Sequence, residues 1–288
     1  MADQDPLRIQ LLSVPGCPLV KKVQKTLENC LSQTRINAVV EEVVGDYNSP
    51  TLLVNGFDVT GRPSPPGQIS CRLDLPSEEE VLTAFRVLSV MKCADGLEEQ
   101  IRAAAFQSLL DTGQRVTVDT LAALTKLDTG MITDCVKRIH HAGHLKLDSD
   151  GFIIGAVGLS ISPTKHEVSL DGRRFWTWCA LDVIGIFGAL NASGFVKSYD
   201  PSSNRAILVD FVKGTPKDTD VMVFIADLSP GISVCCDWCP KINFFTCKSS
   251  AEAWAQTNAA KGSTVSVSNL APVARGAWSR FTGAQIPA

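Results

Sequence analysis

The stretch HEVSLDGRRFWTWCALDVIGIFGAL, residues 166–190, decides how the chemically most informative part of the chain folds. Asp171-Gly172 separates two short strand-like runs, and this dipeptide is a strong signal for a β-hairpin. The apolar run that follows predicts a helix beginning near Cys179. Cys179 and Asp182 are three residues apart, so on such a helix their side chains share one face. A soft metal ligand and a proton carrier are therefore predicted side by side, behind a run of aromatic residues.

The composition is that of a globular chain. Its 288 residues, 45% of them hydrophobic, are enough for two or three domains with cores of their own. A formal net charge of -3 gives no overall attraction to nucleic acid or to an anionic membrane. No apolar run approaches the roughly 18 residues of a spanning helix, and MADQDPLRIQ at the start lacks the pattern of a signal peptide. We therefore expect a cytoplasmic protein without a membrane partner.

Cysteine is common in the chain and histidine is rare. The ten cysteines are expected to be core residues, metal ligands or reactive thiols, because disulfides are rare in a reducing compartment. Three of the four histidines crowd at His140, His141 and His144, so zinc sites that use histidine are not expected near the other cysteines. Gly143 predicts a helix end within this group, which favours interaction with the helix dipole over metal binding.

Residues 1–94 are the first of three predicted domains. LRIQLLSV predicts a strand, PGCP a turn and LVKKVQKTLENCL an amphipathic helix, with later strands in INAVVEEVV and TLLVNGFDV. This order resembles the thioredoxin-like α/β fold. In that family a proline before the third strand is commonly cis and faces the reactive cysteine, which implies that Pro50 lies near Cys17. Val20 stands where the family's C-x-x-C pair has its second cysteine, so dithiol chemistry is not expected from this motif alone.

Cys17 is the residue of the first domain that could carry chemistry. A helix N-terminus lowers the pKa of a cysteine placed there, so Cys17 is a candidate redox or transfer thiol. The alternative is a docking or folding domain with an incidental thiol. The sequence leaves both interpretations open.

Residues 95–157 are the second predicted domain, with three helices followed by a hairpin at Asp150-Gly151. Thr117 and Asp128 are the expected N-caps of the second and third helices. Helices followed by a hairpin are typical of a winged-helix domain. Acidic residues outnumber basic ones between residues 96 and 151, whereas a DNA reader usually has a basic stripe. We therefore expect a structural role and no nucleic-acid partner.

Residues 158–288 are the third predicted domain and contain the opening stretch. Strands are expected in RAILVDFV and VMVFIADL, followed by a cysteine-rich turn, a strand and a short helix in VCCDWCPKINFFTCKSSAEAWA. The tail from Ala259 to Ala288 is rich in small residues and is expected to wrap the surface. The whole chain is thus predicted to be an α+β multidomain protein.

The cysteine-rich turn suggests a soft metal. Cys236-x-x-Cys239, with Cys235 adjacent, is by itself a weak signal for zinc, which normally needs a second pair of ligands. Cys179 could complete a site in space. Thiolate ligands with little histidine favour mercury or copper(I) over magnesium or calcium.

DGRRFWTWCALD resembles the active-site stretch of the organomercurial (alkylmercury) lyases, in which a hairpin delivers a Trp-Cys-Ala-Leu-Asp run. The family's second cysteine lies a few residues before a Phe-Phe pair, here Phe244-Phe245. The resemblance implies an alkylmercury-lyase-like catalytic domain, preceded by a winged helix that is not used on DNA. It assigns catalytic roles to Cys179 and Asp182. By register the second cysteine is Cys239, with Cys235 and Cys236 as accessory ligands or thiols that pass the metal onward.

In the activity that this resemblance implies, two thiolates bind mercury and Asp182 gives a proton to the carbon as the carbon-mercury bond breaks. Burial near aromatic residues would raise the pKa of Asp182, so that the carboxyl holds a proton near neutral pH. The products are a hydrocarbon and Hg(II), which stays on Cys179 and Cys239. The partners implied are an organomercury substrate and an Hg(II) acceptor, either small thiols or a mercuric reductase. No cofactor is expected, but external thiols are needed for turnover.

Two alternatives belong to other functional classes. One is a soft-metal binding or sensing protein without lyase activity, which would require a basic recognition helix in the winged-helix domain. MITDCVKRIHHAG offers only Lys137 and Arg138. The other is a structural zinc site built from Cys179, Cys235, Cys236 and Cys239, which should retain zinc through purification. Neither alternative explains Asp182.

Overall fold

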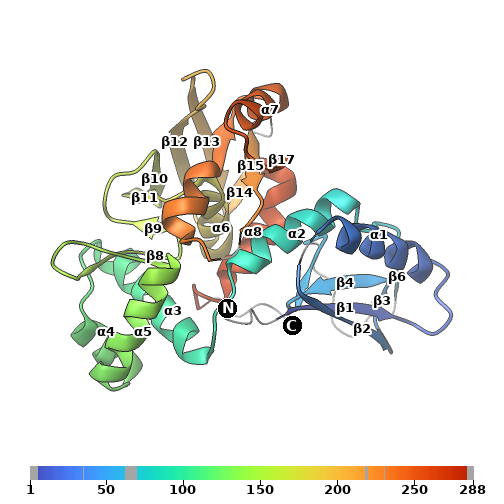
Figure 1. The fold of residues 1–288 in the computed structure, drawn as a ribbon, viewed down its shortest axis with the longest axis horizontal. Helices are drawn as coiled ribbons and strands as arrows, with labels where there is room; N and C mark the ends of the chain where they lie inside the picture. The colour runs from blue at the N-terminus through green and yellow to red at the C-terminus, as the bar shows by residue number, and fades with distance from the viewer. Residues whose placement is uncertain (1–5, 35, 62–69, 218–219, 230, 284–288) are drawn as a thin grey trace. The chain divides into compact units, whose positions relative to one another are not determined.

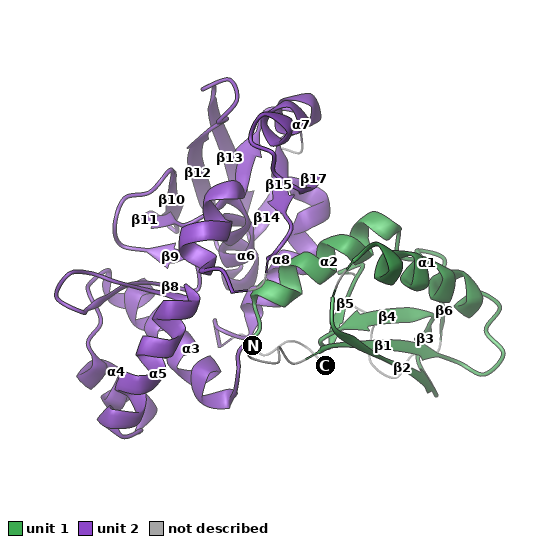
Figure 2. Ribbon diagram, in the orientation of Figure 1, with its two compact units in different colours: residues 1–92, 287–288 green, residues 93–286 purple. Residues whose placement is uncertain are grey.

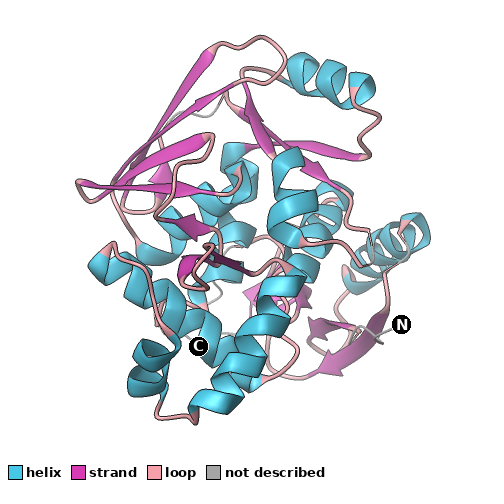
Figure 3. Cartoon of the chain, turned by 60° about the vertical axis from the view of Figure 1, so that its left-hand side comes forward, coloured by secondary structure: helices cyan, strands magenta, loops and turns pink. Residues whose placement is uncertain are grey.

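The computed structural model describes residues 6–34, 36–61, 70–217, 220–229 and 231–283. The chain divides into two compact units (Figure 2), of which unit 1 extends to Lys92 and unit 2 begins at Cys93. Both units contain helices and strands (Figure 3), so the fold class is mixed α+β. Among the described residues, no helix is long and apolar enough to cross a membrane. Residues 1–5 and 284–288, the outer ends of the predicted N-terminal domain and C-terminal tail, lie outside the described residues.

Unit 1 is a small sheet flanked by two helices (Figure 1). Its sheet has the order β2-β1-β4-β5, with β1 parallel to β2 and antiparallel to β4. Residues alternate between buried and more exposed positions along β1, as expected of a strand with one face on the core. The elements are β1 (Leu7–Ser13), α1 (Val20–Gln33), β2 (Ala38–Val44), β3 (Asn48–Ser49), β4 (Thr51–Val54), β5 (Phe57–Asp58), β6 (Ser70–Cys71) and α2 (Glu78–Val90).

The turn before α1 lies against the segment before β4. The Ser49-Pro50 peptide bond is cis, as the sequence resemblance predicted. A hydrogen bond with Ser49 lowers the pKa of the Cys17 thiol, and the backbone groups of Leu19 and Val20 at the helix start act in the same direction. The expected lowering of the Cys17 pKa is therefore confirmed, with the larger contribution coming from a serine that the sequence analysis did not consider.

Unit 2 begins with three helices and continues into a long sheet. The predicted caps are confirmed: the side chain of Thr117 accepts from Thr120 N–H, and that of Asp128 accepts from Gly130 and Met131 N–H. The last helix ends at Gly143, which has a φ of 81°, as predicted. The elements are α3 (Gly96–Thr112), α4 (Val118–Thr125), α5 (Thr129–Ala142), β7 (Leu145–Leu147), β8 (Ile153–Ala156) and β9 (Leu159–Ser160).

One eight-stranded sheet runs through the middle of unit 2, in the order β14-β13-β12-β10-β11-β9-β8-β7. The predicted hairpin is formed by β10 and β11, with Val168 opposite Phe175. Strands on both sides of residue 157 belong to this sheet, so the segments 95–157 and 158–288 are joined by continuous backbone pairing. The added elements are β10 (His166–Leu170), β11 (Arg173–Thr177), β12 (Gly194–Tyr199), β13 (Ala206–Val212) and β14 (Thr215–Pro216).

A central helix, α6 (Ala180–Leu190), leaves the hairpin and is buried along almost its whole length. It packs against α8 (Val267–Ser279), and the two lie together in the middle of unit 2 (Figure 1). Gly185 allows this close packing, because a Cβ at that position would lie 2.3 Å from the Trp278 ring.

The prediction that the tail from Ala259 onward wraps the surface is wrong for the residues described. The tail forms β17 (Gly262–Ser266), the edge of a second sheet, and then α8, which places six side chains in the core. Pro272 and several small residues hid the helical spacing of the apolar side chains. The second sheet has the order β16-β15-β17, with β15 (Met222–Ala226), β16 (Asn243–Phe245) and the covering helix α7 (Lys248–Thr257).

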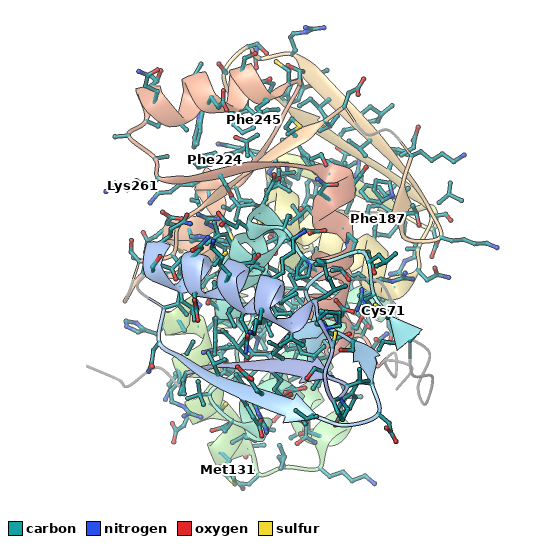
Figure 4. The ribbon with its side chains drawn as sticks, turned by 90° about the vertical axis from the view of Figure 1, so that its right-hand side faces the viewer. Cys71, Met131, Phe187, Phe224, Phe245 and Lys261 are labelled. Carbon is teal, nitrogen blue, oxygen red and sulfur yellow. The ribbon has the colours of Figure 1, made fainter. Side chains whose placement is uncertain are left out.

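Figure 4 shows Phe224 and Phe245 lying near each other in this second layer. Both pack against Trp254 of α7, with ring centroids 5.6 Å apart in each pair. The Phe-Phe pair that fixed the register in the sequence is thus a fully buried part of β16. Its rigidity positions the cysteine segment that precedes it.

Candidate active site

The junction between β11 and α6 positions the first two site residues. Cys179 is the N-cap of α6, in an extended conformation, and its backbone N–H donates to Asp182 Oδ2 over 2.9 Å. Thr177 Oγ1 donates to the carbonyl of Cys179 over 3.1 Å. The three-residue spacing therefore has a structural cause, since a carboxylate at the third helical position reaches back to the cap. The same geometry places the carboxyl beside the thiol.

Cys239 comes from a distant part of the sequence. It begins η2 (Cys239–Lys241), a 3-10 turn that directly follows η1 (Val234–Trp238), a single π turn. Ile242 links the two regions, because its N–H donates to the Cys239 carbonyl (2.9 Å) and its own carbonyl accepts from Ala180 N–H (3.1 Å). The turn that carries Cys239 is thereby joined to the first residue of α6.

The three side chains meet in one place. A ligand atom from each of Cys179, Asp182 and Cys239 lies within 4.8 Å of the other two. Within the described parts of the chain, this is the one group of three or more His, Cys, Asp and Glu residues with metal-ligand spacing. All three residues are buried, with exposed fractions of 0%, 5% and 2% in that order. The structure therefore brings together the residues that the sequence singled out.

Burial controls the charge of this cluster. It raises the pKa of Asp182 to about 7, while hydrogen bonds from the Cys179 thiol and backbone N–H act in the opposite direction. Burial also raises the pKa of Cys179 and of Cys239, and the negative charge of ionised Asp182 adds to both effects. Near neutral pH the two thiols therefore keep their protons until a cation displaces them.

Gly158, between β8 and β9, is a site residue that the sequence analysis missed. A Cβ at this position would lie 2.1 Å from Asp182 Oδ1, and the backbone φ of +86° also favours glycine. The Gly158 carbonyl accepts from Trp178 N–H over 3.0 Å. The sequence signal that could have identified Gly158 is the pair of glycines in GAVG, residues 155–158. Gly155 is also close to the site, because a Cβ there would lie 3.0 Å from the Trp178 ring.

The aromatic residues do not form one continuous wall. Phe175 is buried, whereas Trp176 is half-buried and lies against Arg174, whose guanidinium is 5.4 Å from the ring centre. Because side chains alternate along a strand, Phe175 and Trp176 face opposite sides of the sheet. The buried Nε1 of Trp178 has no hydrogen-bond partner among the residues that the structure describes. The raised pKa of Asp182 agrees in direction with the prediction, and Gly158 lies close to the carboxyl that Cys179 hydrogen-bonds.

The remaining predicted residues lie outside this cluster. Cys235 and Cys236 are in η1, with their sulfur atoms 3.4 Å apart. Cys17 belongs to unit 1. His140 Nδ1 contacts the Leu145 carbonyl at 3.1 Å, and burial lowers the pKa of His144 well below its usual value. Among the described residues, neither histidine takes part in a group with metal-ligand spacing.

Comparison with known proteins points to one family. A family model described as alkylmercury lyase matches residues 159–278, which lie within unit 2 and include all three clustered residues. An alkylmercury lyase from Pseudomonas putida is 34% identical over 116 residues, covering 38% of this chain and 53% of the relative. One from Bacillus cereus is 26% identical over 153 residues, covering 51% of this chain and 66% of the relative. The chain thus spans between about half and two thirds of these relatives.

A solved structure shares the fold. It is described as the crystal structure of the mercury-bound form of MerB2, and it matches with a TM-score of 0.63 and 22% sequence identity. The match covers 69% of this chain and 98% of that one. At this identity the likeness concerns the fold alone.

Proposed function

We propose that this chain, whose residues 159–278 form a domain of the alkylmercury lyase family, cleaves the carbon-mercury bond of alkyl- and arylmercury compounds by protonolysis. The observation that carries the proposal is the buried group of two thiols and one carboxyl within 4.8 Å. Thiolates are the preferred ligands of a soft metal, and a carboxyl beside them is a proton carrier. A structural thiolate site would have no use for the carboxyl.

The proposed reaction moves the proton of the Cys179 thiol to the Asp182 carboxyl and then to carbon. The substrate arrives as an organomercury-thiol complex, and the Cys179 sulfur displaces that thiol and forms a sulfur-mercury bond. Asp182 accepts the proton that Cys179 loses, since its carboxyl already hydrogen-bonds the thiol. Cys239 then adds as the second sulfur ligand, its proton passes to the displaced thiolate, and the second sulfur increases the electron density at carbon. Asp182 returns its proton to the carbon as the carbon-mercury bond breaks, so a hydrocarbon leaves and Hg(II) remains on the two sulfurs.

Burial of Asp182 suits both of its roles. A carboxyl with a pKa of about 7 is close to half-protonated near neutral pH, which lets it act first as a base and then as an acid. An ordinary exposed aspartate would be almost fully ionised at that pH and could rarely donate a proton. The Gly158 contact fixes the carboxyl in position for this exchange.

The finer assignments of fold and role belong to the same proposal. Unit 1 is a thioredoxin-like domain with Cys17 as a redox or transfer thiol, supported by the hydrogen bond with Ser49 that lowers the pKa of Cys17. Residues 95–157 form a winged-helix domain with a supporting role. In support, Gly143 at the end of α5 packs directly on the cysteine segment, where a Cβ would lie 2.4 Å from Val234 N.

The partners follow from the chemistry. Small cellular thiols or a mercuric reductase accept Hg(II), and external thiols are needed for turnover because the product occupies both cysteines. No cofactor takes part, and nucleic acid and membranes are not partners. The protein acts in the cytoplasm.

Release of benzene from phenylmercury by the purified chain, with excess small thiol, tests the proposed function. Cys179→Ser and Cys239→Ser should each abolish turnover, because one sulfur ligand is lost. Cys247→Ser is the matched control and should turn over normally, since Cys247 is exposed and outside the cluster. Tight mercury binding by the wild type without benzene release would reject the proposal in favour of a soft-metal binding protein.

A further inference from the structure

Two more cysteines lie one turn away from the buried cluster. Cys235 and Cys236 are on η1, and Cys239 follows directly on η2. The three cysteines differ in exposure: Cys239 is buried, Cys235 is half-buried and Cys236 is exposed. The three sulfurs therefore form a short series from the site to the surface.

The segment that carries this series is held in place at several points. Cys235 N–H donates to the Gly143 carbonyl over 3.1 Å, and Trp238 Nε1 donates to the Ala226 carbonyl over 2.9 Å. Asp237 closes the turn by accepting from Ser233 N–H over 2.8 Å. The 3.4 Å separation of the Cys235 and Cys236 sulfurs thus belongs to an anchored segment.

The sulfurs are close enough to influence one another electrostatically. The pKa of Cys235 is raised to about 12, first by burial and then by the hydrogen bond and negative charge of Cys236. The charge of Cys236 also contributes to the raised pKa of Cys239. Two sulfurs 3.4 Å apart on one turn can bind a soft cation together, because thiolate is the preferred ligand of such a cation.

In the proposed reaction Hg(II) is left in a buried cluster and needs a route to solvent. After carbon-mercury cleavage, Hg(II) would be held by Cys179 and Cys239, with exposed fractions of 0% and 2%. Exchange between thiols requires the incoming sulfur to reach the atom it attacks, and its rate depends on that access. An external thiol can reach exposed Cys236 far more easily than either buried sulfur.

We propose that Cys235 and Cys236 form an exit site that takes Hg(II) from Cys179 and Cys239 and presents it to a thiol in solution; this inference rests on the proposed lyase function. In the transfer, the Cys236 sulfur bonds to mercury held by Cys239, and the Cys236 proton passes to the sulfur that leaves. Cys235 repeats the exchange against the second sulfur ligand. Two sulfur-mercury bonds form, two break, and no atom is oxidised or reduced.

The test measures transfer without relying on cleavage. Full-length, fully reduced protein is loaded with one equivalent of mercuric chloride and mixed with excess 2-mercaptoethanol. Loss of protein-bound mercury is followed by rapid desalting and elemental analysis. The double variant Cys235→Ser/Cys236→Ser should release mercury about tenfold more slowly than the wild type, a loss comparable to that of a supporting group at a metal site.

Two further variants make the result decisive. Cys247→Ser removes an exposed cysteine outside the series and should release mercury at the wild-type rate. Cys236→Ser alone changes an exposed side chain, so it guards against misfolding of the double variant, and it should also slow release. Equal rates for wild type, Cys236→Ser and the double variant would overturn the exit site. Mercury is loaded as its chloride, so the release experiment does not depend on cleavage of an organomercury compound. Failure to cleave phenylmercury would therefore reject the lyase proposal without bearing on the release rates.

Discussion

At the scale of the residue, the proposed chemistry rests on Asp182 and the groups around it. Its carboxyl is fixed by the Cys179 backbone N–H and by the close approach of Gly158, and burial brings its pKa to about 7. The site thus depends on a glycine that carries no functional group. Its contribution is space and a backbone conformation that other residues adopt only with strain.

Gly158→Ala is expected to reduce benzene release by about a hundredfold, because an ångström-scale shift of a catalytic group has an effect of that size. The new Cβ would lie 2.1 Å from Asp182 Oδ1 and would push the carboxyl away from Cys179. Gly151→Ala is the matched control, since Gly151 has a φ of +84° and no heavy atom within 4 Å of its Cβ position. Similar release rates from both variants would show that backbone strain alone, and not displacement of Asp182, limits the reaction.

At the scale of the element, the sequence predicted the hairpin and the helix that follows it from local signals, but it did not predict contacts between distant segments. The β10-β11 hairpin and α6 were predicted because Asp171-Gly172 and a long apolar run are strong short-range signals. The approach of Cys239 to Cys179 depends on the Ile242 to Ala180 link, which no local pattern encodes. The family resemblance supplied Cys239 as the second cysteine. Helix α8 and the role of Gly158 were missed because small residues carry little sequence signal.

The end of α5 supports the cysteine segment, and one substitution tests that support. Gly143→Ala would place a Cβ 2.4 Å from Val234 N and 2.8 Å from Cys235 N, so the segment must shift. We expect benzene release to fall by about tenfold or more. Gly113→Ala, at the left-handed end of α3, meets only an Arg173 side-chain atom at 3.7 Å. It should cost about 1–2 kcal/mol of stability and leave benzene release unchanged. Equal activity of the two variants would contradict the supporting role.

At the scale of the whole molecule, the residues of the proposed chemistry lie in unit 2. Cys179, Asp182 and Cys239 and their hydrogen-bonding partners described above all lie beyond Lys92. The sequence predicted a mixed α+β chain, and a compact unit beginning at Cys93 lies near the predicted boundary at residue 94. It did not predict that one sheet would run through residues on both sides of 157, because strand order in a sheet is set by tertiary packing.

A chain shortened to residues 93–288 should cleave phenylmercury at the full-length rate in a single turnover. The proposed role of Cys17 is to pass mercury onward. When external thiol is limiting, the shortened chain should therefore turn over repeatedly more slowly than the full chain. The full chain with Cys17→Ser should be slowed to a similar extent. Benzene release and protein-bound mercury report the two steps separately. A folded 93–288 chain that cannot cleave would place part of the chemistry in unit 1.

The most direct measurement is the rate of benzene release from preloaded phenylmercury complexes of the wild type and Asp182→Asn between pH 5.5 and 8.5. In the proposed reaction protonated Asp182 is the donor, so the wild-type rate should be constant at low pH and fall as pH rises through about 7. Asparagine can still accept the Cys179 backbone N–H but has no proton to give, so the variant should keep phenylmercury bound and release no benzene. Release by Asp182→Asn at the wild-type rate would contradict the assignment of Asp182 as the proton donor.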